Sequence, residues 1–247
     1  MRFEAVACTA MDLGIDGKVA LVTAASKGLG RGAALALSRE GVRVAICARD
    51  PERLSATAAQ LPGEVLAIPA DVTEPEAPAR LVAATVERFG SLDILVANAG
   101  GPPQARAMDV VDDDLLAALN ANLITSIRLV QAAVPHMRAA GWGRICLLTS
   151  SSVKQPILTL AYSNTARTGL WAWAKTAAQD LIDDGITLNL ACPGLHATDR
   201  VKELGFGGRQ GDPEDFGRIV AFLCSDAAGF VSGAALQVDG AGTLGLL

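Results

Sequence analysis

A glycine-rich turn is the first stretch of this chain whose residue types and spacing indicate chemistry. Residues 19–22 form a short aliphatic run, Gly28 and Gly30 follow it, and residues 33–40 are rich in alanine and leucine. Because these glycines lack a Cβ, backbone N–H groups can approach an anion closely, and the positive end of a helix dipole favours a phosphate there. The pattern therefore predicts a strand, a phosphate-binding turn and a helix, which is typical of a dinucleotide site.

Two cations accompany the turn. Arg49 follows the second aliphatic run and Ala48, and Lys27 directly precedes Gly28. An acidic side chain at the tip of the second strand would bind the 2′-hydroxyl of NAD, whereas an arginine suits the 2′-phosphate of NADP. We therefore predict NADP(H) as the cofactor in preference to NAD(H). Asp50 argues against this preference, and the alternative is that both cations are solvated surface charges.

The elements that must position these residues recur along the chain. Aliphatic runs typical of strands alternate with helical patterns, at residues 20–22, 42–47, 65–68, 92–96, 144–148, 186–190 and 235–238. This alternation predicts an α/β fold, a single doubly wound, Rossmann-like domain with a seven-stranded, mostly parallel sheet and helices on both faces. We expect the domain over residues 17–247 and assign no role to an N-terminal extension, residues 1–16.

Composition and charge exclude several classes of function. Hydrophobic residues make up 51% of the chain and aromatic residues 4%, so we expect an aliphatic core. The net charge of −5, without a basic run, argues against nucleic acid and anionic membranes as partners. We find neither an apolar stretch near the ~18 residues of a membrane span nor a leader, and predict a cytoplasmic protein. Five scattered cysteines and two histidines indicate buried thiols, with no metal site.

The motifs at the strand ends resemble those of the short-chain dehydrogenase/reductase family, over about residues 18–242. The glycine turn is similar to the family's Thr-Gly-x-x-x-Gly-x-Gly loop, with Ala24 in place of its first glycine. Residues 98–100 match its Asn-Ala-Gly motif and residues 193–198 its Pro-Gly-x-x-x-Thr, while Ala241 replaces its usual second glycine near the C-terminus. Because alanine takes a positive φ only at a cost, we expect the start of the turn to differ slightly from the family's.

The resemblance implies a nicotinamide dinucleotide and assigns a set of residues to it. Asp71 would bind the adenine amino group, although it could equally cap a helix that starts near Glu74. Thr198 and the backbone before it would hold the nicotinamide amide. The full set is Thr23, Ala25, Ser26, Lys27, Gly28, Leu29, Gly30, Arg49, Asp71, Val72, Asn98, Ala99, Gly100, Arg167, Pro193, Gly194 and Thr198.

The family's catalytic residues are altered in this chain. Family members carry a serine after the fifth strand and Tyr-x-x-x-Lys on the next helix; the tyrosine exchanges the proton, and the lysine lowers its pKa and binds the nicotinamide ribose. Aligning Arg167 with that lysine places Ser163 at the tyrosine position and Ser150 at the serine position. Asn122 matches the family's asparagine that holds a relay water, and the alternative is a helix kink without chemistry.

This register leaves the proton donor open. A serine hydroxyl is too weak an acid, and Arg167 cannot shuttle protons because the pKa of a guanidinium exceeds about 12. Tyr162, the only tyrosine in the chain, stands one residue early, and one residue of a helix turns a side chain by about 100°. Tyr162 would miss the site on a regular helix and could swing in from a loop. We take Tyr162 as the favoured acid, with Lys154 and His196 as alternatives.

The sequence thus predicts an NADP(H)-dependent oxidoreductase that interconverts a carbonyl and an alcohol, with a 3-oxoacyl compound as one candidate substrate. The alternative is a non-catalytic NADP(H)-binding protein, a sensor or scaffold on the same fold, which the changes at Ser163 and Arg167 motivate. The resemblance also implies a homo-oligomer, a dimer or tetramer. Only a short glycine-containing loop separates Thr198 from Asp212, so we expect a shallow or open substrate cleft.

Overall fold

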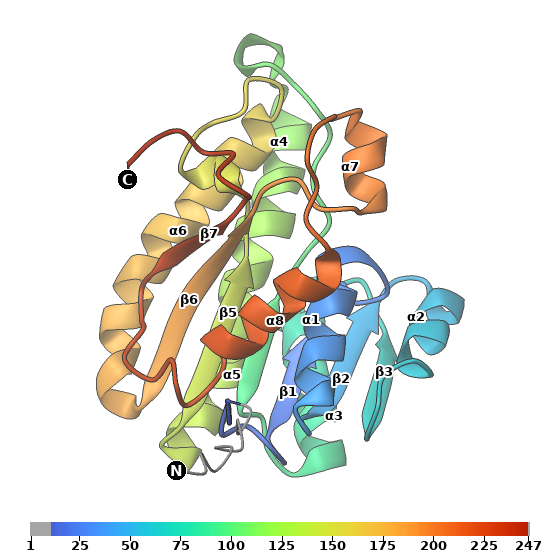
Figure 1. Ribbon diagram of the computed structural model, residues 1–247, viewed down its shortest axis with the longest axis vertical. Helices are drawn as coiled ribbons and strands as arrows, with labels where there is room; N and C mark the ends of the chain where they lie inside the picture. Colours follow the sequence, from blue (N-terminus) through green and yellow to red (C-terminus); the bar gives the residue numbers. More distant parts are fainter. Residues whose placement is uncertain (1–10, 247) are drawn as a thin grey trace, which may run out of the picture.

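Residues 11–246, the part of the chain that this computed structural model describes, form one seven-stranded sheet with helices on both faces (Figure 1). The strands are β1 (Val19–Val22), β2 (Arg43–Ala48), β3 (Val65–Pro69), β4 (Ile94–Ala97), β5 (Gly143–Leu148), β6 (Ile186–Pro193) and β7 (Ala235–Val238). Their order is β3-β2-β1-β4-β5-β6-β7, and every pairing is parallel. The predicted doubly wound α/β fold is confirmed, with a sheet that is parallel throughout.

Burial on both faces of the sheet explains the continuous aliphatic runs. Every residue of β1, β4, β5 and β6 is buried. Strands that are covered on both faces have no solvent side, so their sequences do not alternate between apolar and polar residues. The order of the strands reverses between β1 and β4, and their carboxyl ends therefore flank the crevice where such sheets bind ligands.

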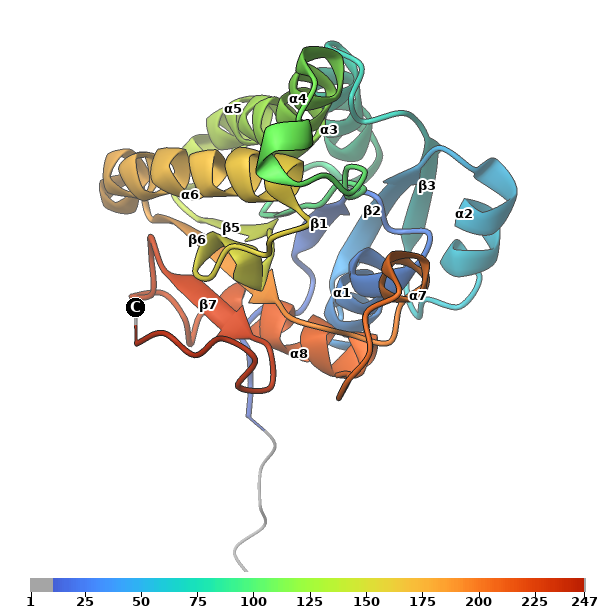
Figure 2. The ribbon, with the colours of Figure 1, turned by 90° about the horizontal axis from the view of Figure 1, so that it is seen from above.

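Two helical layers cover the sheet (Figure 2). One contains α3 (Ala77–Phe89), α5 (Thr125–Ala140) and α6 (Ala161–Leu181), and the other contains α1 (Gly28–Arg39), α2 (Pro51–Ala58) and α8 (Pro213–Leu223). In the second layer α1 and α8 approach so closely that a Cβ at Gly32 or Gly217 would collide with the backbone of the other helix. This packing fixes the position of α1, which begins at the predicted phosphate turn.

Of two aspartates that precede helices, Asp212 caps its helix and Asp71 does not. Asp212 caps α8 as its side chain accepts a hydrogen bond from Glu214 N at 2.8 Å. Asp71 does not cap a helix near Glu74, because α3 begins only at Ala77. Its Oδ1 instead accepts a hydrogen bond from Thr73 N at 2.9 Å, in a local turn.

The long helical segment over residues 112–140 is not regular throughout. α4 (Asp112–Leu119) and α5 are joined by a π-helical turn, η2 (Asn120–Ile124), which contains both asparagines of this segment. By length and composition alone the run Asp112–Ala140 could cross a membrane, although the sequence suggested no such stretch. In this fold α5 packs its buried face on the sheet and belongs to the core.

The N-terminal extension is only partly described, because residues 1–10 lie outside the described range. Ile15, near its end, is 1% exposed and packs in the core, and Leu13 O accepts a hydrogen bond from Asp226 N at 2.9 Å. The end of the extension is therefore packed against the domain. The cysteines of the described residues are free and buried, as predicted: Cys47, Cys146, Cys192 and Cys224.

Candidate active site

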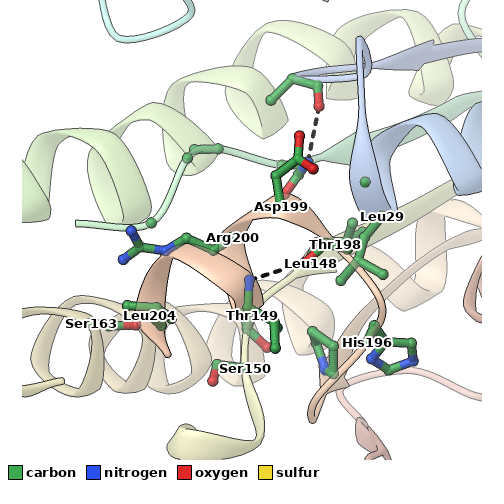
Figure 3. Close-up of a pocket in the computed structure, with 18 of the residues that line it drawn as sticks. Leu29, Leu148, Thr149, Ser150, Ser163, His196, Thr198, Asp199, Arg200 and Leu204 are labelled. Atoms are coloured by element: carbon green, nitrogen blue, oxygen red, sulfur yellow. Dashed lines mark hydrogen bonds between the residues drawn. The ribbon is translucent and has the colours of Figure 1, made fainter. Parts of the chain in front are cut away.

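A cavity of about 1210 Å³ opens at the carboxyl edge of the sheet (Figure 3). It exceeds the range of about 300–1,000 Å³ that is typical of sites for drug-sized ligands, so it has room for a ligand larger than these. Its walls include most of the predicted cofactor residues, and also Ser150, Ser163 and Arg167. The predicted residues that do not line it are Thr23, Ala25, Gly30, Asn122 and Tyr162.

The glycine turn is held by contacts behind the cavity wall. Thr23 Oγ1 donates to Asn98 O at 2.7 Å and accepts from Asn98 N at 2.8 Å, which joins the turn to the segment after β4. A Cβ at Gly30 would lie 2.5 Å from Ala24 O and 2.8 Å from Asn98 Nδ2. Ala24 adopts the left-handed conformation, with φ at +48°. The alanine thus takes a positive φ at the start of the turn in spite of its Cβ.

The first turn of α1 is suited to an anion. Lys27, the N-cap residue, makes no side-chain hydrogen bond to this helix end, and no acidic residue stands in the first turn. Uncapped N–H groups and the helix dipole both favour a phosphate at this point. The residues present therefore fit the pyrophosphate of a dinucleotide.

The adenosine end of the cavity contains Arg49 at the tip of β2. Arg49 is exposed and lines the cavity, next to the buried Ala48. Asp50, which argues for NAD(H), is engaged elsewhere, because its Oδ1 accepts a hydrogen bond from Arg53 N at 3.0 Å and caps α2. Burial raises the pKa of Asp71, but hydrogen bonds from Thr73 and the charge of Arg49 outweigh it and hold the pKa below its usual range.

Lys27 lines the cavity, and its side chain lies beside two carboxylates of the protein. Its Nζ lies 3.3 Å from Asp199 Oδ2 and 4.0 Å from Glu203 Oε1. Both carboxylates belong to α7 (Asp199–Leu204). The side chain therefore links the turn to α7 in this structure.

Ser150, Ser163 and Arg167 share one wall of the cavity. Ser150 Oγ accepts a hydrogen bond from Ser152 N at 3.1 Å, and its own proton stays available for a ligand. Arg167 is 8% exposed, and its Nη1 donates to Leu148 O at 2.9 Å. Burial, together with the nearby charge of Arg200, lowers the pKa of Arg167 to about 10.

Tyr162 points away from the cavity, which corrects the favoured assignment of the proton donor. α6 begins at Ala161, so Tyr162 already lies on the helix and is only 2% exposed. Its hydroxyl accepts a hydrogen bond from Val111 N at 3.0 Å and lies 3.4 Å from Asp114 Oδ2. The side chain thus joins α6 to the start of α4, and the idea that it swings into the site is wrong for this structure.

The two alternative acids lie in different surroundings. Lys154 places its Nζ 4.1 Å from the centre of the Trp171 ring and does not line the cavity. His196 lines it but is 4% exposed, with Nδ1 3.2 Å from Gly194 O and its ring edge-on to Phe216. These contacts hold the His196 ring in the wall, so neither residue presents a free acid to a substrate.

Asn122 lies on the π-helical turn, one layer behind the cavity. It is 2% exposed, its Nδ2 lies 3.4 Å from Ala118 O, and its Oδ1 has no hydrogen-bond partner among residues 11–246. The neighbouring Ala121 lines the cavity in its place. A π-helical turn often marks a functional segment, and an unsatisfied buried oxygen is a site for a bound water.

The sequence reading missed α7 and its Arg200. Residues 199–204 form a helix over the cavity where only a loop was expected, with Thr198 as its N-cap and Gly205 at its C-terminal end. Arg200 hydrogen-bonds to Pro102 O, and Gln104 Nε2 donates to Leu204 O at 3.2 Å. The cleft is therefore partly covered by α7. Threonine, aspartate and a later glycine at this spacing are the signal that could have predicted the helix.

Comparisons with known proteins agree with this geometry. A family model described as Enoyl-(Acyl carrier protein) reductase matches residues 23–243. Dehydrogenase/reductase SDR family member 4 of Sus scrofa is 32% identical over 243 residues, which cover 92% of this chain and 87% of that protein. A 3-oxoacyl-[acyl-carrier-protein] reductase of Synechocystis is 30% identical, over 92% of this chain and 97% of that protein. The structure of L-sorbose reductase from Gluconobacter frateurii, complexed with NADPH and L-sorbose, has a TM-score of 0.89 at 32% identity and covers 96% of this chain and 100% of that one.

Proposed function

The chain belongs to the short-chain dehydrogenase/reductase family, and from that premise we propose that it is an NADP(H)-dependent reductase of small carbonyl compounds. Membership of the family makes it an oxidoreductase that uses a nicotinamide cofactor on a carbonyl or an alcohol. The preference for NADP(H) and the direction of the reaction are the parts that we propose. A 3-oxoacyl compound remains one candidate substrate, and the Synechocystis relative is named for that activity.

The proposed preference for NADP(H) over NAD(H) depends on Arg49. It is an exposed cation at the tip of β2, and Asp50 beside it is engaged as the cap of α2. A guanidinium binds a phosphate through paired hydrogen bonds, whereas it gains little from the ribose hydroxyl that NADH presents at the same place.

The roles of the remaining residues follow from their positions. When bound, the nicotinamide supplies the hydride. We assign the binding of the carbonyl oxygen to Ser150 and Ser163. Arg167 would bind the nicotinamide ribose and stabilise the negative charge that develops on the carbonyl oxygen. Asn122 Oδ1 would hold a water molecule that supplies a proton to the Ser163 hydroxyl. The Ser163 hydroxyl is too weak an acid to ionise on its own at neutral pH, so we expect it to give its proton to the substrate oxygen only as it receives another from this water.

Cofactor binding and turnover test the proposal together. Arg49→Ala should weaken NADPH binding at least tenfold, about 1.4 kcal/mol, and leave NADH within twofold. Fluorescence titration measures both constants, and NADPH oxidation over ketones, aldehydes and 3-oxoacyl thioesters measures turnover. Arg80→Ala, an exposed cation on α3 paired with Glu74, is the control. Equal losses for the two cofactors would refute the role of Arg49. NADPH binding without turnover on any compound would favour the alternative, a non-catalytic sensor or scaffold.

Self-association and location are further parts of the proposal. Large apolar side chains are exposed on the described surface, among them Met108, Leu116, Leu158 and Phe230. We propose that some of these side chains lie in the interface of a homo-oligomer, a dimer or tetramer, in the cytoplasm. Light scattering would measure its mass, and a monomer at micromolar concentration would contradict it.

A further inference from the structure

We propose that Arg167 and Arg200 form an anion-binding subsite beside Ser163, which receives the carboxylate of a short oxo acid. The inference rests on the proposed function and names the class of its substrate. It begins from a buried positive charge that no carboxylate of residues 11–246 neutralises.

Arg167 is that charge. Its side chain lines the cavity at 8% exposure and makes one hydrogen bond within the described residues, from Nη1 to Leu148 O. A guanidinium has five N–H donors, so donors remain for a ligand. Among residues 11–246 no carboxylate lies within 4.0 Å of it, although a buried charge is costly unless it is paired. Ser163, in the position of an ionisable phenol, cannot supply the missing negative charge.

Arg200 brings a second cation to the same place. It extends from α7 over the side of the cavity where Ser163 and Leu204 lie (Figure 3). Its guanidinium hydrogen-bonds to Pro102 O and passes within 3.0 Å of where a Cβ at Gly101 would stand. Arg200 is also close enough to Arg167 for its charge to lower the pKa of that residue. An anion between the two guanidinium groups would relieve this repulsion.

In the part of the chain that the structure describes, the acidic side chains around this part of the cavity do not pair with Arg167, and only Glu203 pairs with Arg200. Asp199 is 3.3 Å from Lys27, and Glu203 lies between Lys27 at 4.0 Å and Arg200 at 3.9 Å. Asp239 accepts hydrogen bonds from the backbone amides of residues 241 and 243. Glu203 is exposed and shared, so it offsets Arg200 only in part.

A carboxylate is the ligand that suits this arrangement. Its planar pair of oxygens matches the fork of a guanidinium. The carbonyl of the same molecule must reach Ser150 and Ser163, on the wall that also carries Arg167. We therefore infer a 2-oxo or 3-oxo acid, in which one or two bonds separate the carbonyl carbon from the carboxylate carbon.

Binding to the cofactor-loaded protein tests the subsite apart from turnover. Pyruvate, 2-oxobutyrate and acetoacetate, each beside its methyl ester, are titrated by calorimetry into protein saturated with NADP⁺. We expect at least one acid to bind tenfold more tightly than its ester. Arg200→Met should weaken that acid at least tenfold more than the ester, and Arg200→Lys should restore part of the loss. Arg106→Met, an exposed arginine outside the cavity, is the matched control.

The possible outcomes separate this inference from the proposed function. Protein that binds NADPH but never prefers an acid to its ester would overturn the subsite alone. Equal losses for acid and ester in Arg200→Met would also overturn it, because they would mean that Arg200 only anchors α7. Inorganic phosphate that competes better than any of the acids would assign the subsite to a phosphorylated substrate and refute the oxo acid. A wild-type protein that binds no cofactor would refute the proposed function itself.

Discussion

The two halves of the cleft are built from different chemical groups. In the proposed cofactor half, around Gly28, Gly30 and Asn98, we expect backbone amides to be the binding groups, and the glycines make room for them. In the proposed catalytic half, around Ser150, Ser163 and Arg167, the groups are side chains on the end of β5 and on α6. The first half has a turn that fits a phosphate, whereas the second has a serine and an arginine where the family's pattern has a tyrosine and a lysine. A binding site formed by backbone amides is thus kept as long as the glycines keep their spacing. A site formed by side chains changes whenever one of its residues is replaced.

The largest effect that we expect is a loss of cofactor binding when the glycine turn is changed. In Gly30→Ala the new Cβ would lie 2.5 Å from Ala24 O, and this backbone atom cannot move without distorting the turn. We expect NADPH binding to weaken about 100-fold, or about 2.8 kcal/mol, in a fluorescence titration. Gly169→Ala is the control, because its Cβ would meet only Leu123 at an ordinary 3.5 Å. Unchanged binding in Gly30→Ala would show that the turn does not receive the cofactor.

An effect of intermediate size, on stability and not on turnover, is expected when the Tyr162 hydroxyl is removed. Tyr162→Phe removes the hydroxyl that accepts the Val111 N–H, and should lower the free energy of unfolding by about 1 kcal/mol. Turnover should stay within twofold, because the hydroxyl faces α4 and not the cavity. Urea unfolding and steady-state rates measure the two quantities. A tenfold fall in turnover at unchanged stability would restore Tyr162 as the acid.

The smallest effect that we expect is a change in stability when Ala24, at the start of the glycine turn, is replaced. Ala24 holds a φ of +48°, which costs an L-residue about 1–2 kcal/mol that glycine avoids. Ala24→Gly should therefore raise the free energy of unfolding by roughly 0.5 kcal/mol, since the greater freedom of glycine in the unfolded chain offsets part of the gain. Ala241→Gly, at a φ of +65°, should change stability in the same direction. Ala25→Gly, whose φ is not positive, should lower it.

The sequence could predict the sheet and the cofactor turn because their signals are long or depend on glycine. The aliphatic run at residues 144–148 falls within one residue of β5, and Asn122, for which a helix kink was the alternative, lies on the π-helical turn. The direction of Tyr162 could not be predicted, because it depended on whether α6 begins before or after that residue. Helix ends are the least certain feature of a sequence pattern. Arg200 was missed because α7 is a single short turn, with too few residues to show a period.

The way in which α7 is attached has a consequence for the timing of the reaction. The helix is joined to the glycine turn by the exposed pair of Lys27 and Asp199, and to the opposite wall by Arg200 and Gln104. Exposed ion pairs and single hydrogen bonds contribute little stability, so we expect these links to open more readily than the sheet. We therefore expect a ligand bound beneath α7 to be released faster as ionic strength rises, because salt screens the exposed pair of Lys27 and Asp199.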